Sequence, residues 1–315
     1  MKIERISRLN FIMTLFILVL HTRAGTNVFD DCPLWYVHLD RFVVDLTSAA
    51  VPTFFSISAF LLFRNYKISD YEKKLSTRMR SLAVPYIIFS VIGFVFINFL
   101  KIIKNGSIDV SFYSVVYDIY HCSFNSPIWY VRALFYYVVV SPIVLLIMNK
   151  MKFLGMLLLL ALSVSVNLIL KVPYDTFVYW LPDIVVFSYF GLYGTKLIEV
   201  ENKNSFCIIA IIILLVLVHD VDPKSSIYWV YRMILPFLFF SMNLCDWKFS
   251  GTFFIYMLHG IVNAVANFVY KDFVYFNFWM PFVRPLSVVL ACFVVYIIVK
   301  KKTPTLFKVL NGNRN

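Results

Sequence analysis

Apolar residues are gathered along this chain into runs separated by short polar connections. The runs are about 20 residues long, which is what an α-helix needs to cross a bilayer core about 30 Å thick. The pattern therefore predicts an all-α, polytopic transmembrane bundle that forms a single domain over residues 1–315. We expect ten spans, at residues 9–23, 42–63, 82–100, 128–148, 153–170, 177–198, 206–219, 227–245, 253–270 and 283–299.

Composition agrees with this pattern. Hydrophobic residues make up 61% of the chain and charged residues 15%, whereas soluble domains have about 25% charged residues. The net charge of +12 would suggest nucleic acid in a soluble protein. Here the basic residues cluster at the ends of the predicted spans, where the positive-inside rule puts them, so we expect a lipid bilayer and no nucleic acid as the partner.

The distribution of charge predicts the orientation. Most lysines and arginines fall in the amino-terminal segment, the even-numbered connections and the carboxyl tail, which places both termini in the cytoplasm. Five of the tryptophans then lie at the outer interface, as an aromatic belt does: Trp35, Trp129, Trp180, Trp229 and Trp279.

Five polar residues inside the spans share one predicted layer in the outer half of the membrane: His21, Asp45, Arg132, Asp183 and Arg232. Charges at membrane depth cost at least ~2.5 kcal/mol each, so they face a partner or a cavity. They could be structural ion pairs. The alternative is a polar cavity open to the outside, and His21 favours it because an imidazole can take and return a proton near neutral pH.

Two further groups of residues can each be interpreted as structural or as functional. Arg78 and Arg80 precede the third span and could be a cytoplasmic anchor, or a phosphate site, since arginine forks match phosphate oxygens. His259 lies near the middle of the ninth span and is either a packing residue or a second functional histidine. The cysteines have no metal-ligand spacing, so we expect no metal; Cys32 and Cys122, in the two long outer connections, could form a disulfide.

Several stretches occur in a characteristic order: NFIMTLFILVLH, VPTFFSISAFLLF, TRMRSLAVPYIIFS, SPIWYVRALFYYVVVSPIV and TFFIYMLHGIV. Together they resemble the motifs of the membrane acyltransferase-3 family, bacterial O-acyltransferases of cell-surface glycans. The first resembles the family's motif of a basic residue, ten intervening residues and a histidine, with Asn10 where the family has arginine or lysine.

The resemblance implies a donor, an acceptor and a location. The donor would be an acyl-coenzyme A (acyl-CoA), most often acetyl, supplied from the cytoplasm. The acceptor would be a hydroxyl group of a surface or lipid-linked glycan, and the protein would lie in the bacterial cytoplasmic membrane.

It also implies roles for individual residues. His21 would be the general base, and Arg132 would orient a reactant or stabilise the oxyanion, with Tyr130 beside it. Arg78 and Arg80 would hold the phosphates of the donor. Residues expected to bind substrate or support the site are Asn10, Trp129, Tyr130, Asp183, Arg232 and His259.

Two competing interpretations remain. A non-catalytic relative that binds glycan would explain Asn10, and a small-molecule transporter would also be polytopic. Against a transporter, the sequence has no inverted repeat and no pair of helices broken by glycine or proline.

Overall fold

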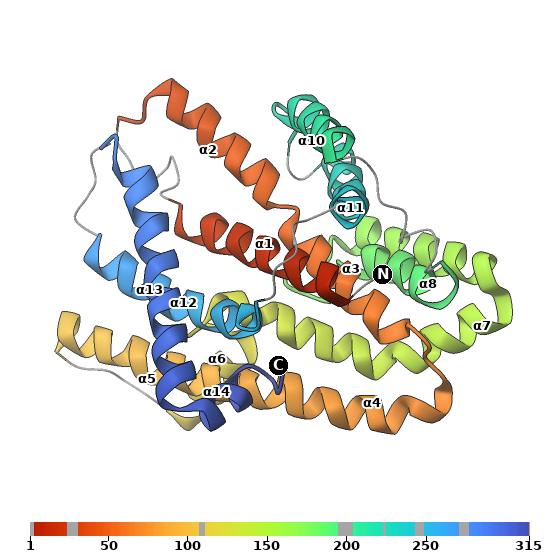
Figure 1. Ribbon diagram of the computed structural model, residues 1–315, viewed down its shortest axis with the longest axis horizontal. Coiled ribbons are helices and arrows are strands. Elements are labelled where there is room, and N and C mark those ends of the chain that lie inside the picture. Colours follow the sequence, from red (N-terminus) through yellow and green to blue (C-terminus); the bar gives the residue numbers. More distant parts are fainter. Residues whose placement is uncertain are drawn as a thin grey trace. The chain divides into compact units, whose positions relative to one another are not determined.

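The computed structural model describes residues 3–23, 31–106, 111–194, 204–222, 225–242, 249–270 and 277–314. Helices are the regular elements of these residues (Figure 1). They are α1 Ile3–Thr22, α2 Leu34–Thr47, α3 Ala50–Phe63, α4 Tyr71–Arg78, α5 Val84–Asn105, α6 Phe112–His121, α7 Trp129–Leu170, α8 Leu181–Tyr193, α10 Asn204–Val218, α11 Ser226–Ser241, α12 Thr252–Val269, α13 Met280–Lys302 and α14 Pro304–Leu310. The helical fold class is confirmed for this part of the chain.

Each predicted span overlaps one of these helices. In the described residues, five helical stretches are long and apolar enough to cross a membrane: Leu34–Phe63, Ile68–Ile103, Ser126–Leu170, Thr252–Val269 and Met280–Lys302. The other apolar helices are shorter, at 10–17 residues. A membrane protein is therefore supported, while the count of ten spans and the cytoplasmic termini stay predictions.

Some boundaries differ from the prediction. The second predicted span, 42–63, is two helices, because α2 ends at Thr47 and α3 begins at Ala50. The fourth and fifth fall within α7, where Lys152 leaves helical geometry at φ 49° and ψ −122°. Residues 195–198 and 243–245, at the ends of the sixth and eighth predicted spans, lie outside the described residues.

The chain divides into two compact units. The first unit comprises residues 1–16, 44–78 and 133–249, and the second unit comprises 17–43, 79–132 and 250–315. The single domain predicted from the sequence stays a prediction.

In the first unit, α3 and α8 pack closely. A Cβ atom at Gly191 would come within 2.7 Å of the Phe60 carbonyl oxygen, so glycine allows the two backbones to approach. The rings of Phe55 and Trp180 stack at 5.5 Å, and the Tyr137 hydroxyl bonds the Ser188 hydroxyl. These contacts are among large, fully buried side chains, which gives this unit its core.

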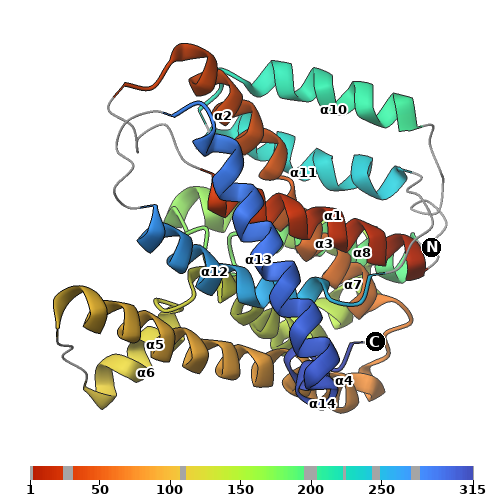
Figure 2. The same cartoon turned by 60° about the vertical axis from the view of Figure 1, so that its left-hand side comes forward.

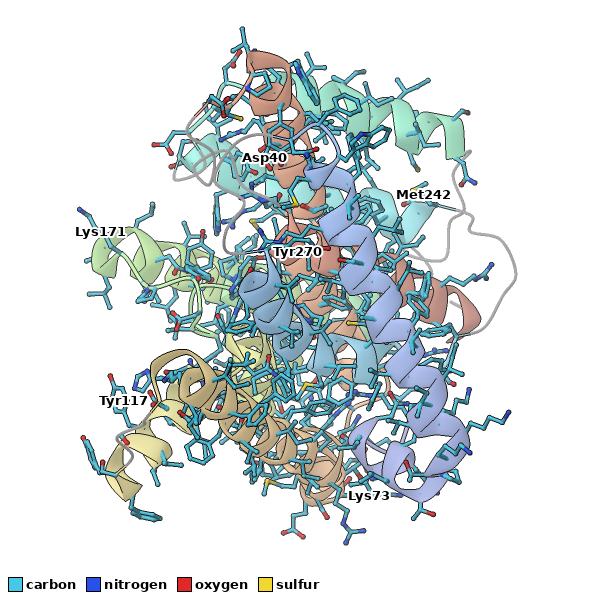
Figure 3. The ribbon with its side chains drawn as sticks, turned by 90° about the vertical axis from the view of Figure 1, so that its left-hand side faces the viewer. Asp40, Lys73, Tyr117, Lys171, Met242 and Tyr270 are labelled. Carbon is cyan, nitrogen blue, oxygen red and sulfur yellow. The ribbon has the colours of Figure 1, made fainter. Side chains whose placement is uncertain are left out.

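In the second unit, α12 packs beside α13 (Figure 2). The carboxyl tail binds the start of α12: Oδ1 of Asn311 accepts from the backbone N–H of Phe254 at 3.1 Å, and its Nδ2 donates to the Ser250 carbonyl at 2.7 Å. A side-chain amide thereby satisfies one of the orphan N–H groups of a helix start. This end of α12 is thus fixed, and Tyr270, labelled in Figure 3, follows its other end.

Candidate functional site

One face of α12 is polar inside an otherwise apolar helix. Tyr256, His259, Gly260 and Asn263 follow the spacing i, i+3, i+4 and i+7, so they lie within about 100° of the helix surface. We call these four residues the polar stripe. His259 is fully buried.

One contact fixes the tautomer that the His259 ring has in its neutral form. Its Nδ1 atom is hydrogen-bonded to the backbone carbonyl of Tyr256. A carbonyl oxygen can only accept, so Nδ1 carries the proton, and in the neutral ring Nε2 then has a lone pair. The side chain therefore presents a hydrogen-bond acceptor at its far end.

His21 lies against this stripe. It stands at the end of α1, where it is exposed, and its ring centroid is 5.4 Å from that of His259. Nδ2 of Asn263 donates to the His21 carbonyl at 3.0 Å. The structure thus brings together two histidines that the sequence placed in separate spans, and an asparagine holds the backbone of one of them.

A second segment, around residues 125–130, is bound to the same stripe. Nδ2 of Asn125 donates to the Met257 carbonyl at 2.9 Å, and the Tyr256 hydroxyl donates to the Pro127 carbonyl. Oδ1 of Asn125 lies so close to Gly260 that a Cβ there would be 2.1 Å away. Glycine is needed at this position because the carboxamide occupies the space of a side chain.

Arg132 and its neighbours begin α7 in the same unit. Its guanidinium donates to the Tyr120 carbonyl at the end of α6 and lies 5.0 Å from the centre of the Tyr120 ring. The Tyr130 ring meets that of Tyr256 edge-on at 5.8 Å, and Trp129 is buried beside it in the chain. Tyr130 therefore contacts the polar stripe directly, and Arg132 is attached to the end of α6.

The remaining members of the predicted outer layer belong to the first unit. Asp183 is buried, and the charge of Arg232 acts on it. Arg232 donates to the Tyr179 hydroxyl and lies 5.2 Å from the Trp180 ring centre. This cluster fits the interpretation as a structural group, because its arginine is sandwiched among aromatic rings.

Asp45 also lies in the first unit and is fully buried. Its carboxylate accepts from the Tyr228 hydroxyl at 2.8 Å and lies 4.0 Å from Nδ1 of His219, and its carbonyl accepts from the Tyr231 hydroxyl at 2.8 Å. The single layer expected from the sequence is therefore divided: only His21 and Arg132 of its five members belong to the second unit.

Arg78 and Arg80, predicted to bind the donor, and Asn10, predicted to bind substrate or support the site, are also divided between the units. Asn10 lies in the first unit, partly buried, and its carbonyl accepts from the Thr14 hydroxyl at 2.8 Å. Arg78 ends α4 in the first unit and is partly exposed, whereas Arg80 is exposed in a π-helical turn, Met79–Ala83, of the second. Lys74, on α4, donates to the Leu62 carbonyl at 2.9 Å.

The cysteines and the metal prediction can be checked in the described part of the chain. No disulfide joins Cys32 and Cys122, and Sγ of Cys122 lies 3.2 Å from the Tyr86 hydroxyl. The described residues contain no cluster of metal-ligating side chains.

Sequence reasoning missed two residues of this site, Asn125 and Asn263. Asn263 follows His259 by one helical turn, so the polar spacing on α12 could have identified it. Asn125 has no such signal, since it comes directly before the 3₁₀ turn Ser126–Ile128 and reaches α12 only in the folded chain.

Comparison with known proteins gives one match. A family model described as an acyltransferase domain matches residues 6–300. No curated protein and no solved structure matches the chain.

Proposed function

Because this chain belongs to the acyltransferase-3 family, whose model covers residues 6–300, we propose that it transfers an acyl group, most simply acetyl, from acyl-CoA to a hydroxyl group of a cell-surface or lipid-linked glycan. The donor comes from the cytoplasm and the protein lies in the bacterial cytoplasmic membrane. The observation that carries the proposal is the exposed imidazole of His21 beside the polar stripe of α12.

His21 acts as the general base. It takes the proton of the acceptor hydroxyl as that oxygen attacks the thioester carbonyl, so the new C–O bond forms and a tetrahedral oxyanion develops. Collapse of this intermediate breaks the C–S bond, and the imidazolium returns the proton to the departing coenzyme A thiolate. The donor and the acceptor supply every atom that this reaction transfers, and the thiol of coenzyme A is the leaving group.

Arg132 stabilises the oxyanion or orients a reactant. A guanidinium has several N–H donors in a fixed fork, and the bond to the Tyr120 carbonyl uses one of them. Developing negative charge is stabilised most when such donors are already in position. Tyr130, which contacts Tyr256 on the stripe, is the neighbour that shares this role.

Arg78 and Arg80 bind the phosphates of coenzyme A. We expect the double variant Arg78→Gln/Arg80→Gln to raise the KM for acetyl-CoA about 100-fold or more with little change in kcat, since two charge-assisted bonds of at least ~1.5 kcal/mol each together contribute about 3 kcal/mol. Initial rates in membrane vesicles at varied acetyl-CoA would measure this. Lys101→Gln, an exposed charge on α5, is the control. Impaired membrane insertion with an unchanged KM would instead support the anchor interpretation.

The overall function is tested by mass spectrometry of surface polysaccharide from cells with and without the gene. We expect an O-linked acyl group, its mass that of acetyl, to be lost when the gene is removed and restored by its return. A non-catalytic relative that binds glycan, which Asn10 would fit, predicts the same polysaccharide in both strains. Substrate flux across vesicles without acyl transfer would favour a transporter.

A further inference from the structure

Three hydrogen-bond acceptors around α12 have no donor. Nε2 of His259, Oδ1 of Asn125 and Oδ1 of Asn263 are each buried and without a hydrogen-bond partner among the residues that the structure describes. His259 is 0% exposed and Asn125 2%. Buried polar atoms almost always have a partner, so three orphans in one place need an explanation.

The hydrogen bond at the other end of each side chain fixes whether the unpartnered atom is a donor or an acceptor. In all three side chains the N–H group donates to a backbone carbonyl. Nδ1 of His259 donates to Tyr256, Nδ2 of Asn125 to Met257, and Nδ2 of Asn263 to His21. Carbonyls only accept, so neither carboxamide can be flipped and the imidazole has one tautomer when neutral. What remains in every case is an acceptor.

The three side chains meet on one part of α12. His259 and Asn263 are one turn apart on the polar stripe, and Asn125 packs on Gly260, which lies between them in the sequence. The backbone of His21 is bound to Asn263, and its ring lies 5.4 Å from that of His259. Two of the three side chains, His259 and Asn263, therefore contact the residue to which we assign the role of base.

We infer that Asn125, His259 and Asn263 form a seat that binds hydroxyl groups of the acyl acceptor, each hydroxyl donating one hydrogen bond. This inference rests on the proposed function, and it adds the place where the sugar acceptor is bound. The hydroxyls held by the seat are neighbours of the reacting one, which is left to His21. A thioester carbonyl does not fit this seat, because it has no proton to donate.

The test uses two probes: methyl α-glucoside, and the same sugar with every hydroxyl methylated, which has no hydrogen-bond donor. Binding to the purified full chain in detergent is measured by saturation-transfer NMR. We expect the hydroxylated sugar to bind and the methylated sugar not to bind. Equal binding of both, or no binding of the hydroxylated sugar, would overturn the inference.

Variants locate the binding. Asn263→Leu, which is close in shape, removes one acceptor together with the Nδ2 donor to the His21 carbonyl. The lost acceptor should weaken binding of the sugar about 5- to 10-fold, as loss of one hydrogen bond of ~1 kcal/mol or slightly more does. Gly260→Ala, whose Cβ would displace Oδ1 of Asn125, should do the same. Asn267→Leu is the matched control on α12, because Oδ1 of Asn267 already accepts from Arg284.

Unchanged binding by Asn263→Leu and Gly260→Ala, both folded by circular dichroism, would refute the seat. If either variant does not fold, the result for the other decides. The proposed function is tested by a different outcome. If the wild-type protein binds the glucoside through these residues but transfers no acetyl group, the binding seat is supported and the proposed acyl transfer is contradicted. Where transfer is measurable, Asn263→Leu should raise the KM for the acceptor and leave the KM for acetyl-CoA unchanged.

Discussion

We expect His21→Ala to lower glycan acylation by about 10²- to 10⁴-fold, the contribution of a positioned general base. The imidazole of His21 is exposed at the end of α1 and lies beside His259, so its removal takes away the group that we propose accepts the hydroxyl proton. Acetyl transfer from labelled acetyl-CoA in membrane vesicles measures the loss, at equal protein content.

A matched control comes from the same unit. His38 is an exposed histidine on α2, and His38→Ala should retain full transfer. His21→Gln keeps a polar side chain but has no basic nitrogen, so it should be as impaired as the alanine variant while inserting normally. Full acylation by either His21 variant would contradict the assignment of the base.

Much of the helical architecture could be predicted, because apolar runs of membrane length have few other stable structures. The break between α2 and α3 was missed, because it falls inside residues 42–63, which the apolar pattern predicts as one span. Pro52 could have marked it: it lies in the first turn of α3, where a missing N–H breaks no helical hydrogen bond. Three helices, α4, α6 and α14, were missed because they are too short for a span.

The site was predictable in part, for a physical reason. Topology gives the depth of a residue in the membrane but not its direction around the bundle. Depth alone therefore grouped Asp45, Asp183 and Arg232 with His21 and Arg132, although the first three belong to the other unit. The approach of His21 to His259 depends on how α1 and α12 pack, which periodicity cannot specify.

The second large effect is expected for Arg132→Lys. If the guanidinium stabilises the oxyanion with oriented N–H groups, lysine should lower kcat by about 10²- to 10³-fold, as loss of an oxyanion donor does, because an ammonium is a point charge without the planar fork. The KM for acetyl-CoA should change little. Initial rates at saturating glycan and varied acetyl-CoA separate the two constants.

This variant also separates catalysis from a structural role. A lysine at position 132 still carries a donor for the Tyr120 carbonyl and a cation for its ring, the two contacts that attach Arg132 to α6. Loss of kcat in a folded Arg132→Lys protein therefore reports on the transition state and not on the attachment. Arg23→Lys is the control, since Arg23 is a partly buried arginine of the same unit, paired with Asp40 at 2.5 Å, and lysine preserves that pair. A kcat within about twofold of wild type for Arg132→Lys, below the effect of one oxyanion donor, would restrict Arg132 to holding α6.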